Sequence, residues 1–375
     1  MRNNLNVALT HDYLKEYGGA ERVLEVLHGI FPNAPLYTAY YDPAGLGLHA
    51  ADFKNWVIYT SWFQKMPFTH RLLSPFRVFA PMMFESFDLS GYDLVISSSS
   101  AVYFSKAVIT KPETLHISYI HTPPRYLYGY TTMFDYQKKW YTRLGGALIN
   151  HFLRIYDFEI SQRPDILVAN SRNVAERIKK FYRRDSVVIY PPVDVEGYQV
   201  SSIKYQGKRE DYFLSVGRMV KGKGIEVIVK VCSAAGVPLK VAGGGPQLEE
   251  LKKIAGPNVE FLGPVPDEKL PELFTKAKAT IVASEDEDFG IVPVESQACG
   301  TPVVARLAGG FKETVIAGKT GLFFKTEKEL EEILQNFEPG KFKEEDCHKQ
   351  AEKFSKERFK KEIAGLINEN IKKTI

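Results

Sequence analysis

The fold of this chain is decided by residues 280–305, TIVASEDEDFGIVPVESQACGTPVVA. The runs at 280–283 and 302–305 are apolar and β-branched without polar alternation, which is typical of strands buried on both faces. Between them Pro293 suits the first position of a helix, so we expect a helix that begins around Pro293 and ends at Gly300. Strand, helix and strand in this order predict a parallel sheet.

Runs of the same kind recur along the whole chain, separated by longer helix-like segments. They lie at 6–10, 93–97, 116–120, 166–169, 187–190, 212–216, 239–242 and 259–262. The pattern breaks at Pro191-Pro192 and in the polar residues that follow as far as Asp211, which indicates a linker. With 375 residues, the sequence predicts an α/β protein of two doubly wound domains, in which ligands bind at the carboxyl ends of strands.

Composition excludes several classes of protein. The hydrophobic fraction is 44%, the charged fraction 25% and the net charge +4, so we expect a globular protein that is not basic enough to bind nucleic acid. The 3 cysteines are scattered, as in a cytoplasmic protein with reduced thiols. The N-terminal apolar run is too short for a signal peptide, and no run approaches the ~18 residues of a membrane span. We expect a cytoplasmic location, with peripheral contact at the inner membrane face left open.

Residues 62–84 are aromatic, basic and rich in methionine. One interpretation is an amphipathic surface that touches lipid or a lipid-linked acceptor. The other is a set of helices packed on the first sheet, which is favoured because aromatic residues at helical spacing usually face a core. Pro67, Pro75 and Pro81 interrupt any long helix in either case.

Two acids flank the expected helix start of residues 280–305. Glu287 precedes it and Glu295 falls in its first turn, with Gly290 between them. Free N–H groups at a helix start bind phosphate oxygens, and carboxylates accept hydrogen bonds from sugar hydroxyls. The pattern therefore predicts a nucleotide-sugar clamp. The alternatives are a helix-dipole partner for Glu295, and a solvated acidic loop or a divalent metal site at 286–288.

Cations follow another expected strand, in the stretch VGRMVKGKG at 216–224. Arg218 can bind phosphate in a bidentate manner and Lys223 can act as a point charge. Together they can stabilise the charge on a leaving nucleoside diphosphate, which disfavours the metal site because no metal is then needed. The alternative is a flexible basic loop.

Glycines follow two other strands. Gly18 and Gly19 open a helix expected to begin near Ala20, where backbone N–H groups can meet a phosphate. The fingerprint GxGxxG is absent, which counts against an NAD-dependent oxidoreductase. Gly244, in the run GGGP at 243–246, would let the backbone approach a nucleotide, although a tight turn explains that run nearly as well.

His121 follows the strand that ends at Ile120 and precedes the rigid sequence TPPR. At the edge of a sheet, a histidine can hydrogen-bond a sugar hydroxyl or assist proton movement. A purely structural role is the alternative.

These stretches together resemble a known family. The spacing from Glu287 to Glu295 resembles the E-x7-E signature of the retaining GT-B glycosyltransferases of family 4, also called group 1. Further similar stretches are CGTPVV at 299–304, GR with KG at 217–224, GGGP at 243–246, FLG at 261–263 and GKTG at 318–321. YIHTP at 119–123 is similar to mannosyltransferases of the WbaZ type. Phe289, Gly290, Ile291 and Val292 are similar to the corresponding residues of GDP-mannose users.

The resemblance implies a GT-B architecture of two Rossmann-like domains facing across a cleft. Residues 1–192 would form the acceptor domain and 193–354 the donor domain, and a helix at about 355–375 would pack back on the first.

The resemblance also implies roles for single residues. Glu287 would bind the sugar hydroxyls and Glu295 would bind the ribose. Arg218 and Lys223 would bind the diphosphate. The remaining contacts would come from Gly18 and Gly19 to phosphate, from His121 near the sugar, and from Val265 to the base. Asp288 departs from the glycine common after the first acid, and this puts the identity of the sugar in doubt.

The function expected is the retaining, metal-independent transfer of a hexose to a glycan or lipid-linked acceptor, with mannose from GDP-mannose as the first choice. The nucleotide sugar is a co-substrate and no cofactor is expected. Two alternatives stay open: a nucleotide-sugar epimerase of GT-B fold and a non-catalytic binding subunit. The binding subunit is disfavoured because Arg218, Lys223, Glu287 and Glu295 are all present.

Overall fold

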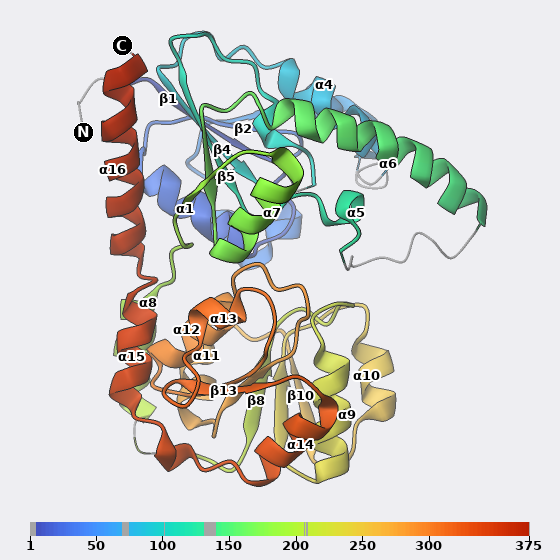
Figure 1. Cartoon of the computed structure of the whole chain (residues 1–375), viewed down its shortest axis with the longest axis vertical. Helices are drawn as coiled ribbons and strands as arrows, with labels where there is room; N and C mark the ends of the chain where they lie inside the picture. The colour runs from blue at the N-terminus through green and yellow to red at the C-terminus, as the bar shows by residue number, and fades with distance from the viewer. Residues whose placement is uncertain are drawn as a thin grey trace. The chain divides into compact units, whose positions relative to one another are not determined.

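The structure is a computed structural model that describes residues 5–69, 75–100, 102–130, 140–205, 207 and 209–374. The chain divides into two compact units. The first takes in the chain up to Pro192 and the C-terminal segment from Phe359 onward, and the second runs from Val193 to Arg358. Each unit is built on one parallel sheet (Figure 1).

The first sheet has the strand order β3-β2-β1-β4-β5-β6-β7, with all neighbours parallel. Its strands are β1 (Val7–His11), β2 (Leu36–Thr38), β3 (Ile58–Thr60), β4 (Leu94–Ser99), β5 (Leu115–Ile120), β6 (Ile166–Ala169) and β7 (Val187–Val188). The order reverses between β1 and β4, which lie side by side although 82 residues separate the end of one from the start of the other. Such a reversal marks the place where doubly wound sheets bind ligands.

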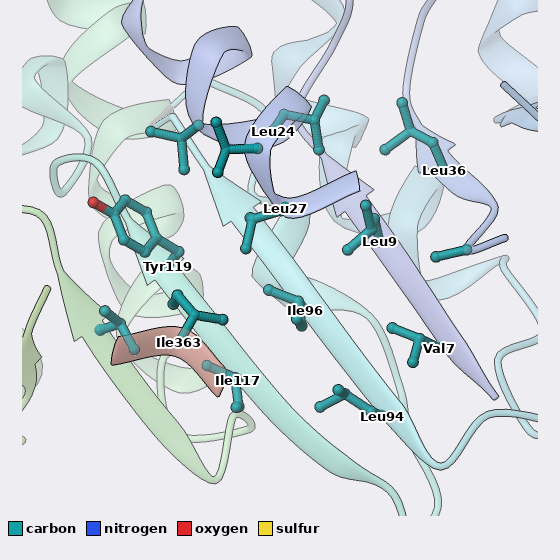
Figure 2. Packing of buried hydrophobic residues seen from close by; sticks show 14 of the residues in the cluster. Val7, Leu9, Leu24, Leu27, Leu36, Leu94, Ile96, Ile117, Tyr119 and Ile363 are labelled. Atoms are coloured by element: carbon teal, nitrogen blue, oxygen red, sulfur yellow. The ribbon is translucent and has the colours of Figure 1, made fainter. Parts of the chain in front are cut away.

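Helices cover both faces of this sheet. On one face α1 (Gly19–Ile30) and α16 (Lys356–Thr374) bury a core that includes Leu9, Ile96 and Ile363, as Figure 2 shows. The other face packs against α4 (Ala80–Glu85) and α6 (Trp140–Ile160). The other described helices of this unit are α2 (Pro43–Leu46), α5 (Arg125–Tyr128), α7 (Arg172–Tyr182) and the 3-10 turns at Gly47–Ala51, Trp62–Lys65, Pro75–Phe79 and Ser105–Ala107.

The second sheet has the order β10-β9-β8-β11-β12-β13, again parallel throughout. Its strands are β8 (Phe213–Val216), β9 (Leu239–Ala242), β10 (Val259–Gly263), β11 (Thr280–Val282), β12 (Val303–Arg306) and β13 (Gly321–Phe324). The order reverses between β8 and β11.

Eight helices of the described chain belong to the second unit. They are α8 (Val195–Ser202), α9 (Ile225–Ala235), α10 (Leu248–Ile254), α11 (Leu270–Lys276), α12 (Ile291–Ala298), α13 (Phe311–Thr314), α14 (Glu327–Gln335) and α15 (Glu344–Glu352), with 3-10 turns at Ile203–Tyr205, Asp267–Lys269 and Pro339–Lys341. The core lies between the sheet and helices such as α9 and α14, which contribute Ile228, Val229 and Leu330. The expected fold class of two doubly wound α/β domains is confirmed.

The described residues of the segment 62–84 are partly buried in the core of the first unit, and lipid contact stays a prediction. Its residues 70–74, with His70 and Arg71, lie outside the described residues. Phe63 and Met83 are buried in the core of the first unit, whereas Phe68 and Met82 are exposed. No helix in the described part of the chain has both the length and the apolarity needed to cross a membrane.

A buried ion pair joins several helices of the first unit. The ammonium of Lys106 lies 2.6 Å from Oδ1 of Asp157 on α6, and the two side chains are 1% and 0% exposed. The hydroxyls of Tyr128 and Tyr182 donate to the same carboxylate at 2.8 and 3.3 Å. The carboxylate therefore neutralises Lys106 and also holds α5, α6 and α7 together.

His116 on β5 predicts a loss of stability in acid. Its Nε2 lies 3.0 Å from the hydroxyl of Ser97, and its buried Nδ1 has no hydrogen-bond partner among the described residues. Burial, with the positive charges of Arg163 and Arg184, lowers the pKa of the ring to about 3. An unfolded histidine has a pKa near ~6.5, so below that pH only the unfolded state gains the proton. The free energy of unfolding therefore has its full value above pH ~6.5. Below that pH it falls by about 1.4 kcal/mol per pH unit, down to the pKa of His116 in the folded state.

The measurement is urea unfolding at several pH values between ~6.5 and ~4. His116→Leu removes the titrating group, so its stability is expected to fall less steeply than that of the wild type. His151→Gln, at an exposed position on α6, is the matched control and should keep the wild-type slope. Equal slopes for wild type and His116→Leu would contradict the buried neutral ring.

Candidate functional site

The loops that carry the predicted cations and acids leave adjacent strands of the second sheet. The first, residues 217–224, follows β8, and the second, residues 284–290, follows β11. These two strands are neighbours at the point where the strand order reverses. Both loops therefore lie at the sheet edge where this type of fold binds ligands.

The two loops are in direct contact. The ammonium of Lys223 lies 2.9 Å from Oε2 of Glu287, with 38% of the lysine side chain and 15% of the glutamate side chain exposed. The hydroxyl of Ser284 donates to the carbonyl oxygen of Gly222 at 2.9 Å. A cation and a carboxylate, 64 residues apart in the sequence, are thus already held side by side.

Gly224 makes this approach of the loops sterically feasible. It has φ +71 and forms the N-cap of α9, and a Cβ there would lie 2.3 Å from the carbonyl oxygen of Ala283. Any larger residue would combine a strained backbone with a clash. The glycine therefore lets α9 begin directly against the end of β11, with Lys223 as the residue before it.

A third loop, after β12, holds Glu287 from another side. The N–H of Gly310 donates to the carbonyl oxygen of Glu287 at 2.9 Å. A Cβ on Gly309 would lie only 2.2 Å from that same oxygen. The backbone of Glu287 is therefore fixed by two glycines that the sequence analysis did not identify, because nothing in their local pattern shows what they pack against.

The helix after the acidic loop begins earlier than expected. Gly290, at φ +96, caps α12, which starts at Ile291 and not around Pro293. Pro293 is tolerated at the third helical position because the first four N–H groups of a helix have no partner within it. Glu295 consequently lies in the second turn and not in the first, and it is buried, with 3% exposed. The helix start has no side-chain cap.

Phe289 and Val292 differ in how their side chains are used. Phe289 is 2% exposed, and its ring packs edge-on against Phe354 at a centroid distance of 5.2 Å. Its side chain is thus part of the core, and we expect only its backbone to be available to a ligand. Val292 is half-buried on the first turn of α12 and packs partly on a small apolar cluster.

The other predicted residues of the second unit lie along the same edge of the sheet. Arg218 is exposed in the loop after β8. The N–H of Met219 donates to the carbonyl oxygen of Gly244 at 2.8 Å, which ties that loop to the one after β9. Gly243 is bonded in turn to Gly263 at the end of β10, and half-buried Val265 follows two residues later.

Gly18, Gly19 and His121 belong to the first unit. α1 begins at Gly19, with Gly18 as its N-cap, one residue earlier than expected. His121 is the residue after β5 and is 9% exposed, and its Nε2 lies 2.9 Å from the hydroxyl of Ser98. Burial, with a smaller contribution from the charge of His11, lowers the pKa of His121 to about 3. The ring is therefore neutral at physiological pH.

Asp12, directly after β1, is a buried polar residue that the sequence motifs did not predict. Its carboxylate accepts hydrogen bonds from the backbone N–H groups of Val102, Tyr103 and Ser105 at 2.7–2.9 Å. Burial favours the neutral acid, but attraction to His11 and these backbone donors outweigh it and lower the pKa of Asp12. The aspartate thus fixes the loop after β4 at the point where the strand order reverses. The available signal was the polar sequence HDY at the end of an apolar run.

The acids at 286–288 were also weighed as a metal site. Within the described ranges, no group of three or more His, Cys, Asp or Glu side chains is placed to hold a metal ion. Glu287 is instead bonded to Lys223.

Two family models match the chain. The model for glycosyl transferases group 1 matches residues 202–354, and the model for Glycosyltransferase Family 4 matches residues 17–196. The chain belongs to glycosyltransferase family 4 (group 1). The two matches fall on the two units of this family 4 chain, one on each.

Curated relatives agree with the family. A D-inositol 3-phosphate glycosyltransferase from Mycobacteroides abscessus is 30% identical over 190 residues, 45% of this chain and 43% of the relative. An uncharacterized glycosyltransferase of Methanocaldococcus jannaschii is 26% identical over 204 residues, 52% of this chain and 56% of the relative. The matches to these relatives thus span about half of their length.

The solved structures show the fold. HepE of Anabaena in complex with UDP and glucose has a TM-score of 0.69 at 18% identity, with 97% of this chain and 100% of that chain covered. Sucrose-phosphate synthase of Thermosynechococcus elongatus has a TM-score of 0.71 at 18% identity, with 97% and 98% covered. This family 4 chain has the GT-B fold.

Proposed function

We propose that this protein is a glycosyltransferase that moves a hexose from a nucleotide sugar to an acceptor. The observation that carries the proposal is the ion pair between Lys223 and Glu287, at 2.9 Å, beside the switch point of the second sheet. It places a cation suited to a diphosphate next to a carboxylate suited to sugar hydroxyls. A nucleotide sugar presents both chemical groups a few bonds apart.

The diphosphate would be held by charge and by backbone N–H groups. Lys223 and Arg218 supply the positive charge, and the uncapped N–H groups of Ile291 and Val292 at the start of α12 can bind phosphate oxygens. These groups would stabilise the negative charge that develops on the leaving nucleoside diphosphate. The proposed transfer is metal-independent for that reason.

The rest of the donor would be distributed over neighbouring loops. Glu287 would bind the sugar hydroxyls and Glu295 the ribose, and the backbone near Gly244 and Val265 would meet the base. The first unit would supply the acceptor site, and its Gly18 and Gly19 would contact phosphate. His121 would lie near the sugar.

The proposed donor is GDP-mannose, as the resemblance of residues 119–123 and 289–292 suggests. The main competitor is UDP-glucose, with which HepE of Anabaena forms a complex. The proposed acceptor is a glycan or a lipid-linked glycan, reached in the cytoplasm or at the inner membrane face. Retention of configuration is proposed with the family resemblance.

A thermal-shift panel tests the donor. At about 100 times its dissociation constant, a ligand of the native state stabilises it by about 2.7 kcal/mol. We expect a rise of several degrees in the melting temperature with one nucleotide sugar among GDP-mannose, UDP-glucose and UDP-galactose. NAD serves as the control and should produce no rise. If every nucleotide sugar leaves the melting temperature unchanged, the donor hypothesis fails.

Two other functions share this site and are separated by one assay. A nucleotide-sugar epimerase would change the sugar without an acceptor, and a binding subunit would bind the donor without turnover. Release of nucleoside diphosphate only when an acceptor is present would support transfer over both.

A further inference from the structure

Four buried polar side chains form a chain of contacts at the carboxyl ends of β1, β4 and β5. Glu21 on α1 lies 3.2 Å from Nε2 of His11, whose Nδ1 lies 3.0 Å from the hydroxyl of Ser98. The same hydroxyl lies 2.9 Å from Nε2 of His121. The residues are 6%, 0%, 0% and 9% exposed in the order Glu21, His11, Ser98 and His121. Only His121 has a part in the proposed function.

The partners of His11 determine which of its ring nitrogens carries a hydrogen. Nε2 faces a carboxylate oxygen of Glu21, and Nδ1 faces both the carbonyl oxygen of Ser98 at 3.1 Å and its hydroxyl. A carbonyl oxygen can only accept hydrogen bonds. Nδ1 of His11 therefore carries a hydrogen, which it directs to the oxygens of Ser98.

A hydrogen on Nδ1 of His11 leaves the Ser98 hydroxyl with one direction in which to donate. The Nδ1 hydrogen of His11 points at the two oxygens of Ser98, so the hydroxyl hydrogen of Ser98 is directed to Nε2 of His121. Nε2 of His121 must then be the bare, accepting nitrogen. Since the ring of His121 is neutral, its single hydrogen lies on Nδ1.

We infer that Glu21, His11 and Ser98 are positioning residues that hold His121 in the tautomer with the hydrogen on Nδ1, so that His121 donates a hydrogen bond to an oxygen of the ligand. Within the part of the chain that the structure describes, no residue accepts a hydrogen bond from this nitrogen. The nature of that ligand, the donor sugar, rests on the proposed function, whereas the tautomer does not.

β4 also provides a matched control, one residue before Ser98. Ser97 is equally buried, and its hydroxyl lies 3.0 Å from Nε2 of His116. Because successive side chains of a strand point to opposite faces, this second serine–histidine pair lies on the other face of the sheet. It has the same chemistry and burial as the Ser98–His121 pair but no link to Glu21 or His11.

Activity separates the two serines. Ser98→Ala is expected to lower kcat/KM about tenfold, the cost of one hydrogen bond to the ligand, and Ser98→Thr, which keeps the hydroxyl, should restore most of it. Ser97→Ala should stay within about twofold of the wild type, although both alanine variants lower the melting temperature by similar amounts. Equal kcat/KM values for the two alanine variants would show that Ser98 has only a structural role, and would overturn the inference.

Nitrogen NMR of the whole protein labelled with 15N-histidine tests the tautomer without any substrate. His121→Gln identifies the signals of His121, which should show a bare Nε2 and a protonated Nδ1. Ser98→Ala should give a mixture of tautomers, and Glu21→Gln should shift the ratio in the same direction. A protonated Nε2 of His121 in the wild type would overturn the inference. If the His121 signals are unchanged in Glu21→Gln, Glu21 and His11 do not act as positioning residues. If the protein transfers no sugar, the proposed function fails while the tautomer result still stands.

Discussion

Lys223→Met is expected to lower kcat about 10²–10³-fold, which is the usual cost of removing one group that stabilises charge in a transition state. The methionine keeps the length of the side chain and removes the ammonium, so the loss reports charge and not packing. The lysine is 38% exposed and already lies beside Glu287. It is therefore positioned before the ligand binds, and the leaving diphosphate would meet a charge that needs no reorganisation.

The control and a double mutant sharpen this test. Lys230 on α9 forms an ion pair with Glu327 at 2.8 Å, exposed on both sides, and Lys230→Met should leave kcat unchanged. Lys223→Met and Glu287→Gln both remove the same contact. The loss of kcat/KM in the double variant should therefore be smaller than the product of the losses in the two single variants. Turnover of Lys223→Met at the wild-type rate, measured by acceptor-dependent release of nucleoside diphosphate, would remove the ion pair from the mechanism.

The sequence predicted the central strands well because they are buried on both faces. β4 and β5 are fully buried along their length, so β4 reads as an unbroken apolar or small-residue run, and β5 reads as a mostly apolar run that includes His116. β2, β3 and β13 were not predicted. β2 and β3 have 3 residues each, with β3 only partly buried, and β13 has 4 and begins with Gly321. Such short segments contain too few residues to show a period.

Single residues of the candidate site could be predicted from the sequence, but the contacts between them could not. The pattern of charges singled out Lys223 and Glu287, yet their contact depends on β8 and β11 being neighbours. The role of Gly309 depends on a carbonyl oxygen 22 residues earlier, which no local pattern can show. The start of α12 was predicted too late because Pro293 is a strong local signal, whereas the need for a glycine at position 290 depends on its positive φ and on the nearby ring of Phe311.

The buried network of the first unit could not be read from the sequence for a similar reason. His11 lies on β1, Ser98 on β4 and His121 directly after β5, whereas Glu21 lies on α1. The first three are ordinary polar residues at the ends of apolar runs. Their contacts appear only when the parallel register places His11 opposite Ser98, with β5 next to β4.

The second large effect is expected in stability, at the ion pair of Lys106 and Asp157. Lys106→Met should lower the free energy of unfolding by about 3–5 kcal/mol, because it leaves a buried carboxylate without its counter-charge. The carboxylate would keep the hydroxyls of Tyr128 and Tyr182 as donors. Those two hydrogen bonds are too few to compensate for the lost cation in an environment with no exposed surface. Urea unfolding of wild type and variant measures the difference.

A surface pair and a double variant decide between charge and packing as the origin of that loss. Lys179 and Asp185 lie 3.1 Å apart with side chains 75% and 88% exposed, and Lys179→Met should cost less than about 1 kcal/mol. Lys106→Met combined with Asp157→Asn removes both charges and keeps an acceptor for the tyrosines. It should therefore recover part of the stability lost in Lys106→Met. If the double variant is less stable than Lys106→Met, the uncompensated carboxylate is not the cause, and the loss must come from the contacts of the ammonium with the rings of Phe104 and Tyr182.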